Sequence, residues 1–128
     1  MNNDVFYVSV AGINYRATEE DVGPILGYTK SYPVEADPEA EGVFLKDGKL
    51  IGFIPMKRKK EYLEFKKEAQ NKEGLCLFSG NIKKATNWNG ESYFVGNIAI
   101  VRGEGIKELL EAHYNADFNL FGGKTPQL

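Results

Sequence analysis

A tight turn between two hydrophobic runs is the sequence feature that most restricts what this chain can fold into. Residues 46–49 (KDGK) separate the runs 43–45 (VFL) and 50–54 (LIGFI). Asp-Gly is a preferred pair in two-residue hairpin turns, because both turn positions must adopt positive φ angles. The pattern therefore predicts a β-hairpin, with Asp47 and Gly48 at its turn.

Other segments are rich in β-branched and aromatic residues and predict more strands. The clearest is 5–11 (VFYVSVA). A weaker strand is expected over 28–34, at a sheet edge or a strand end because it contains Pro33. Asn89-Gly90 predicts a second hairpin turn. The strands that flank it are expected over 75–82 and 91–101, with 83–90 as the connecting loop.

Two segments predict helices. In 56–72, Tyr62, Phe65 and Ala69 fall on one apolar stripe, and Gly74 follows as the expected C-terminal glycine. A shorter helix is expected over 106–114, and a brief helical turn over 18–21 that Gly23-Pro24 stops.

The order of these elements favours one fold class. Strands joined by hairpins form antiparallel sheets, and five or six short strands usually curl into a small barrel. We therefore expect a β-rich α+β fold: a small OB-like antiparallel β-barrel of five to six strands with one longer and one shorter helix. The 128 residues fit a single domain over 1–128, with its core at about 5–114 and a C-terminal tail at 115–128.

The residue types that enzymes use are sparse. His113 is the single histidine, and it is expected to be a partly exposed residue near a helix end. Cys76 stands between two leucines, which predicts an inert core thiol. Gly122-Gly123-Lys124-Thr125 lacks the upstream glycine and the strand–helix context of a phosphate-binding loop. We therefore expect a non-catalytic binding domain without a metal or another cofactor.

An acidic cluster occupies residues 35–41 (EADPEAE). Alternating carboxylates can form a hydrolase site or a calcium cradle. The spacing differs from that of an EF-hand, so a solvated loop is the favoured interpretation.

The charge and cysteine content bear on partners and compartment. The formal net charge is −2, whereas a nucleic-acid module usually has an excess of Lys and Arg. Nucleic-acid binding would therefore need a local basic patch. One free cysteine, a polar N-terminus and the lack of a long apolar run favour a cytoplasmic location without membrane insertion.

Basic and aromatic residues form the candidate nucleic-acid contacts. Lys57, Arg58, Lys59 and Lys60 begin the first predicted helix, where the helix dipole mildly disfavours cations. This mismatch hints at a ligand, although a solvated helix face is the alternative.

Two further groups lie near predicted turns. Lys83, Lys84 and Trp88 belong to the second hairpin loop, where Trp88 either stacks on a base or folds back over the barrel end. Asn14, Tyr15 and Arg16 follow the first strand and are placed to contact an oligonucleotide at a barrel rim, unless Tyr15 simply caps the barrel.

Three segments in this order resemble the HIRAN domain. The first strand ends in 12–15 (GINY). Residues 37–43 (DPEAEGV) are similar to the family's Asp-x-Asn-Ala-Ile-x-Val segment. Residues 51–55 (IGFIP) match the family's Ile-Gly-Tyr-Ile-Pro run and are followed by a helix. The order and approximate spacing agree over 5–101, which is most of the chain.

The resemblance implies an OB-like barrel that binds single-stranded DNA and, in helicase-linked members, a free 3′ end. It places Tyr15 at the family's base-stacking aromatic, Asn14 where an arginine is frequent, and Phe53 among the contacts. The chain also departs from the family: Ala36 replaces a second stacking ring, Glu39 the segment's Asn and Glu41 its Ile. These changes are expected to weaken DNA binding through lost stacking and repulsion.

Two functions remain open from the sequence. The first is binding of single-stranded DNA or a DNA end, which predicts that Tyr15 and the basic residues share one face. The second is a protein-interaction or structural module on the same barrel, with an acidic pocket over 35–41 and an apolar patch elsewhere. A small enzyme is disfavoured because general acid–base candidates are missing.

Overall fold

The computed structural model describes residues 4–120, with side chains through residue 113. The described residues form six strands in one antiparallel sheet, in the order β1-β6-β5-β2-β3-β4, together with two α-helices. The elements along the chain are β1 (Val5–Ser9), the 3-10 helices η1 (Ile13–Tyr15) and η2 (Glu19–Asp21), β2 (Gly23–Ser31), β3 (Glu41–Leu45), β4 (Leu50–Phe53), α1 (Met56–Ala69), β5 (Cys76–Thr86), β6 (Ser92–Val101) and α2 (Glu104–Leu120).

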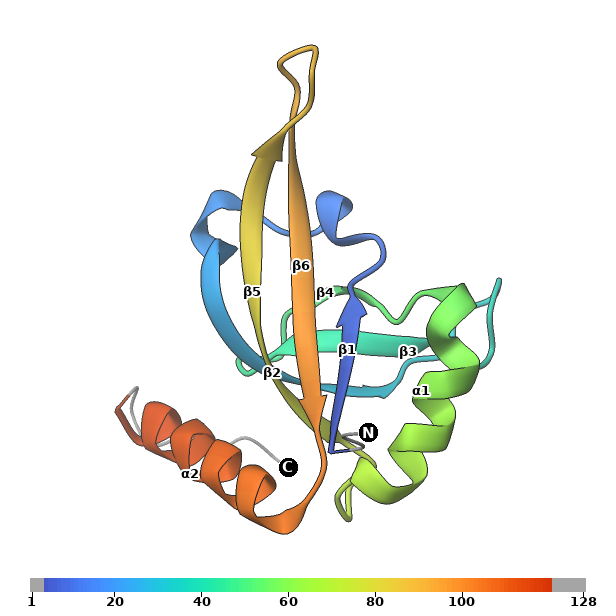
Figure 1. Cartoon of the computed structure of the whole chain (residues 1–128), viewed down its shortest axis with the longest axis vertical. Helices are drawn as coiled ribbons and strands as arrows, with labels where there is room; N and C mark the ends of the chain where they lie inside the picture. Colours follow the sequence, from blue (N-terminus) through green and yellow to red (C-terminus); the bar gives the residue numbers. More distant parts are fainter. Residues whose placement is uncertain (1–3, 121–128) are drawn as a thin grey trace.

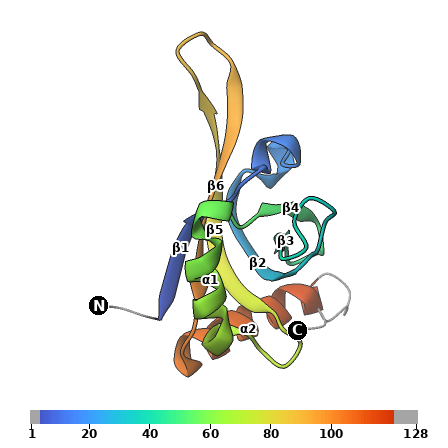
Figure 2. The same ribbon diagram turned by 90° about the vertical axis from the view of Figure 1, so that its right-hand side faces the viewer.

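The sheet curls into a half-barrel, and this confirms the predicted fold class (Figures 1 and 2). Its two outer strands approach each other just beyond the end of β1. There Ala11 and Phe53 exchange backbone hydrogen bonds of 2.8 and 2.9 Å. Gly52 permits this approach, because a methyl group at its Cα would overlap the carbonyl oxygen of Ala11.

Helix α1 runs alongside β1 (Figure 2). It contributes Tyr62, the largest fully buried side chain of the described core. The ring of Phe6 in β1 contacts Tyr62 edge-on at 6.1 Å and Phe65 at 5.6 Å. Helix α2 follows β6 and packs Leu110 against Leu77 and Val101, on the other face of the sheet. The two helices therefore cover different faces of one curled sheet.

A hydrogen-bonded polar cluster lies inside this core. Lys66 donates to the buried Glu41 carboxylate at 2.7 Å. The Tyr62 hydroxyl donates to the same oxygen at 3.0 Å and lies 2.7 Å from the Thr29 hydroxyl. Burial raises the pKa of Tyr62, so its hydroxyl stays neutral. The prediction of a solvated acidic loop is wrong for Glu41, because this carboxylate belongs to β3 and points inward.

Strand β2 differs from its prediction in extent and position. It begins at Gly23 instead of residue 28 and lies between β3 and β5 rather than at an edge. It ends at Ser31, so Pro33 lies just past the strand end, as the other predicted alternative required. Pro24 fits inside the strand because β3 pairs only from Gly27 onward, so the missing N–H of Pro24 faces no second partner. The Gly23-Pro24 pair thus marks the start of a strand.

Both predicted hairpins form, but their turns have a different geometry. Leu45 N donates to Lys49 O at 2.9 Å, Gly48 N donates to Leu45 O, and Gly48 has a φ of 95°. Within the described residues only glycines have positive φ, so Asp47 does not. This is a three-residue turn closed by a left-handed glycine, not the predicted two-residue turn. The turn that ends at Gly90 repeats this pattern.

The two long elements of the second half also differ from expectation. Strand β5 continues to Thr86, so Lys83 and Lys84 lie in a strand and not in a loop. Helix α2 continues to Leu120, past the predicted end at 114, and is longer than α1. His113 consequently lies within a helix rather than near its end. The predicted tail over 115–128 starts as helix, and its residues 121–128 lie outside the described residues.

Helix α1 ends at Ala69, before the predicted residue 72. Gln70 adopts an extended conformation, and Gly74 occupies the following turn instead of the helix cap. Within residues 4–120, no helix has both the length and the apolar character that a membrane crossing requires.

Removing the cation from the buried cluster should destabilise the fold. We expect Lys66→Met to lower the free energy of unfolding by about 3 kcal/mol, because Glu41 would remain buried without its cation. Lys67→Met is the matched control, since Lys67 pairs with Glu64 at an exposed site and should cost less than about 0.5 kcal/mol. Urea unfolding followed by circular dichroism measures both, and equal losses would contradict the prediction.

Candidate functional site

The end of the half-barrel beneath the β5–β6 hairpin is closed by η1. Ile13 is buried there and packs at Gly96, where any side chain would overlap it. Asn14 Oδ1 accepts a hydrogen bond of 2.9 Å from the backbone N–H of Phe94 in β6. With η1 fixed in this way, Tyr15 points outward and is 87% exposed. Ile13, and not Tyr15, therefore caps the barrel.

A row of packed aromatic rings begins beside Arg16, the residue that follows Tyr15. The Arg16 guanidinium lies 5.4 Å from the ring centre of Phe53, which is 6.0 Å from Tyr32. Phe44 follows at 5.8 Å, and Tyr28 stacks on Phe44 at 5.3 Å with an angle of 11° between the rings. We call these four residues, Phe53, Tyr32, Phe44 and Tyr28, the aromatic row.

Two cations contact the aromatic row. Arg16 is at the Phe53 end, and the Lys30 ammonium lies 5.1 Å from the Phe44 ring and 6.0 Å from the Tyr28 ring. Within the described residues, neither cation forms an ion pair with a carboxylate. Cation–π contacts hold a charge in place without neutralising it, so both cations can still bind an anion.

Most of this site was missed by sequence reasoning, which named Arg16 and Phe53 but not Tyr28, Lys30, Tyr32 or Phe44. The sequence did contain a signal for part of the site, because residues two apart in a strand, such as Tyr28 and Lys30, project from the same face. The register of β2 with β3, which places Tyr28 opposite Phe44, is what brings the rings together. That register joins two strands, and the sequence of either strand alone does not specify it.

The basic run at the start of α1 does not act as one surface. Lys59 is buried and pairs with Asp37. Arg58 lies 4.8 Å from the Phe6 ring and bonds to Glu61 at 3.2 Å. Lys57 and Lys60 alone among the four extend to solvent. The structure therefore leaves two of these four predicted contacts available for a ligand.

The β5–β6 hairpin projects as a two-stranded arm beyond the body of the protein (Figure 1). Trp88 lies in its terminal turn and is 95% exposed, so it does not fold back over the barrel. Lys83 and Lys84 occupy successive strand positions and so point to opposite faces. Lys84 pairs with Glu19, which neutralises it. Lys83 is therefore the cation of this group that stays available.

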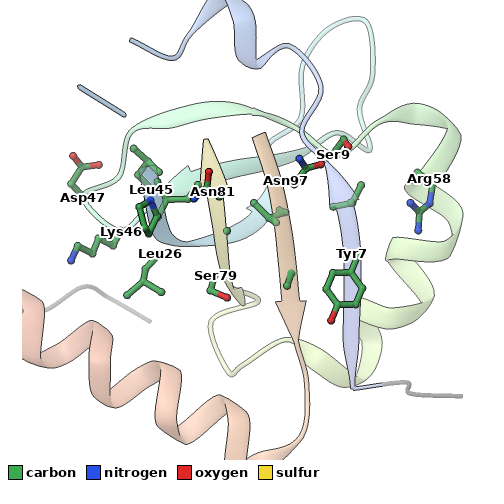
Figure 3. Close-up of a pocket in the computed structure, with 16 residues that line it drawn as sticks. Tyr7, Ser9, Leu26, Leu45, Lys46, Asp47, Arg58, Ser79, Asn81 and Asn97 are labelled. Atoms are coloured by element: carbon green, nitrogen blue, oxygen red, sulfur yellow. Dashed lines mark hydrogen bonds between the residues drawn. The ribbon is translucent and has the colours of Figure 1, made fainter. Parts of the chain in front are cut away.

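A groove of about 1210 Å³ crosses the outer face of β1, β6, β5 and β2 (Figure 3). Tyr7, Ser9, Asn97, Asn81 and Ser79 are among its lining residues. Arg58, at one end, is the single predicted contact that reaches it. The aromatic row and this groove are thus separate features.

The thiol and the metal-ligating residue types of the described residues can be placed directly. Cys76 is fully buried, and burial raises the pKa of its thiol, which suppresses the reactive thiolate. No cluster of His, Cys, Asp or Glu within the described part of the chain is arranged to hold a metal ion. Phe44 of the aromatic row is buried and Tyr28 and Phe53 are half-buried, so Tyr15, Tyr32, Arg16 and Lys30 are the parts of this site that solvent reaches most freely.

Comparisons of the chain with protein-family models, with curated proteins and with solved structures find no match. The resemblance to the HIRAN domain therefore remains a prediction carried by the sequence motifs.

The ion pair between Lys59 and Asp37 affects the pKa of the Asp37 carboxyl, which can be measured. The hydrogen bond from Lys59 holds the pKa of Asp37 below its ordinary value. The pair thus stabilises the fold at neutral pH, and this contribution is lost as the pH falls through the lowered pKa. We expect Lys59→Gln to raise the Asp37 pKa, and Lys57→Gln to leave it unchanged, in carboxyl-carbon NMR titrations. An Asp37 that titrates alike in all three proteins would show that Lys59 is free.

Proposed function

We propose that this protein binds single-stranded nucleic acid, with DNA as the expected form, along Tyr15 and the aromatic row. One observation carries the proposal. Tyr15, an almost fully exposed ring, directly precedes Arg16 in the chain, and the cations Arg16 and Lys30 lie over rings of the aromatic row. Neither cation has a carboxylate partner within residues 4–113.

The two kinds of group would act on different parts of the ligand. The faces of the inner rings are occupied by one another, so the row serves to position the cations. Arg16 and Lys30 would contact phosphates, while the open face of Tyr15 would stack on a base, as single-strand binders commonly do. A paired base has its faces covered by its neighbours, so stacking on Tyr15 favours single strands.

The surrounding charge limits the strength of this binding. Glu35 and Glu39 are exposed in the segment between β2 and β3, and Tyr32 stands in the same segment. Their carboxylates would repel phosphates near the row. The Glu41 carboxylate adds no such repulsion, because Lys66 neutralises it inside the core. We therefore propose weak binding that depends strongly on salt.

Replacing Tyr15 tests the stacking role. Tyr15→Ala should weaken binding of a fluorescein-labelled oligothymidine by roughly 5- to 150-fold, because one stacked base contributes about 1–3 kcal/mol. Fluorescence anisotropy at low salt measures the affinity, with the 3′ end either free or blocked. Tyr7→Ala is the control, since Tyr7 is also exposed but belongs to the groove. Absence of binding by the unaltered protein at low salt would overturn the proposal and favour the protein-interaction module.

The salt dependence tests the two cations. Each phosphate contact to a single strand adds about 0.7 to the slope of log affinity against log salt. We expect Arg16→Gln and Lys30→Gln each to reduce the slope by about this amount. Lys67→Gln should leave it unchanged, because Lys67 is paired with Glu64 on the exposed side of α1. Slopes that do not differ among the variants would place the phosphate contacts elsewhere.

A further inference from the structure

The floor of the groove is a regular grid of side chains. In one row, strand pairing aligns Ser9, Asn97, Asn81 and Pro24 across four strands. In the next row it aligns Tyr7, Ala99, Ser79 and Leu26. Residues directly opposite each other on paired strands share a face of the sheet. Both rows therefore face the groove, as Figure 3 shows for the labelled side chains.

Within the described side chains, helix α2 leaves the polar residues of these rows exposed, while Leu26 of the second row packs against the same cluster as Leu110. Its Leu110 packs against Leu77 and Val101, which belong to the row below. The covered row is apolar, whereas the open rows carry hydroxyl and amide groups. The open rows also contain Tyr7, Pro24, Leu26 and Ala99, so the groove floor is mostly apolar surface interrupted by hydroxyl and amide groups. Such a mixture suits a ligand that has both apolar and hydrogen-bonding parts.

The centre of the groove carries no charged side chain. Its charged residues, Lys46, Asp47 and Arg58, stand at the two ends (Figure 3). Arg58 is already engaged by the Phe6 ring and by Glu61. A phosphate chain that crossed this floor would meet no cation at its centre. The groove therefore disfavours nucleic acid, unlike the aromatic row.

Several polar groups of the floor have no protein partner. Asn97 Oδ1 accepts a hydrogen bond of 2.7 Å from Ser9, which leaves the NH₂ group of Asn97 available. The Asn81 amide and the Ser79 hydroxyl form no side-chain hydrogen bond within the described residues. An amide both donates and accepts, so it matches a ligand hydroxyl, which does the same. Beside them the Tyr7 ring is 69% exposed and offers a flat apolar surface.

We propose that the groove binds an uncharged oligosaccharide, with Asn81 and Asn97 bonding its hydroxyls and Tyr7 covering the C–H face of one sugar ring. Neutral donors and acceptors beside an aromatic ring match such a ligand in both its polar and its apolar parts. OB-type sheets bind oligosaccharides as well as oligonucleotides. At about 1210 Å³ the groove exceeds the roughly 300–1,000 Å³ of typical small-molecule pockets, which suits several linked sugars.

NMR of the ¹⁵N-labelled protein tests this proposal with four neutral probes: cellotetraose, maltotetraose, tetra-N-acetylchitotetraose and mannotetraose. At least one should shift the amide signals of Tyr7, Ser9, Asn81 and Asn97 at millimolar concentration. Asn81→Ala and Asn97→Ala should each weaken that binding by about tenfold, the loss of one or two hydrogen bonds. Tyr15→Ala should leave it unchanged, which separates this site from the proposed nucleic-acid site.

Two outcomes would overturn the proposal. One is that none of the four oligosaccharides shifts the groove signals, whether or not oligothymidine binds at Tyr15. The other is that oligothymidine or a sulfated heparin tetrasaccharide shifts these signals more strongly than every neutral probe. That result would make the groove an anion site.

Discussion

The buried pair of Glu41 and Lys66 sets the relation between helix α1 and the curled sheet. A carboxylate removed from water is costly unless a cation and hydrogen-bond donors surround it. Lys66 and Tyr62 of α1 supply both, and Thr29 of β2 adds its hydroxyl to the cluster. These partners come from three elements that are far apart in the sequence, so the charges are compensated only when α1 lies against the inner face of β2 and β3.

Seating α1 in this way also decides which cations face solvent. Lys59 and Lys66 are largely buried, and each forms an ion pair, Lys59 with Asp37 and Lys66 with Glu41. A count of lysines therefore overstates the basic surface of this protein. Arg16 and Lys30 differ because aromatic rings, not carboxylates, hold them, and they keep their full charge at fixed positions. On a chain of net charge −2, such placement matters more than the number of cations.

Local sequence signals predicted the first strand, both hairpins and helix α1, since each depends on residues close together in the chain. The fold class followed from their order. The inward position of Glu41 was not predicted, because its partner Lys66 lies 25 residues away and an isolated acidic run resembles a solvated loop. Tyr15 and Arg16 were identified as rim residues, whereas Tyr28 and Phe44 become neighbours only through the β2–β3 register. The groove likewise requires the alignment of four strands.

The backbone bridge between Ala11 and Phe53 links the proposed binding surface to the closure of the curled sheet. Tyr15 and Arg16 come shortly after Ala11 in the chain, and Phe53 is itself the other residue of the bridge. A nucleic-acid strand bound at Tyr15 and along the aromatic row would cross the Ala11–Phe53 bridge. It would therefore hold the two outer edges of the sheet together. A ligand that binds only when the Ala11–Phe53 bridge is formed must, by thermodynamic linkage, make the opening of this bridge less favourable. Ligand binding would then slow the hydrogen exchange of the Ala11 and Phe53 amides, even if the ligand contacts neither of them.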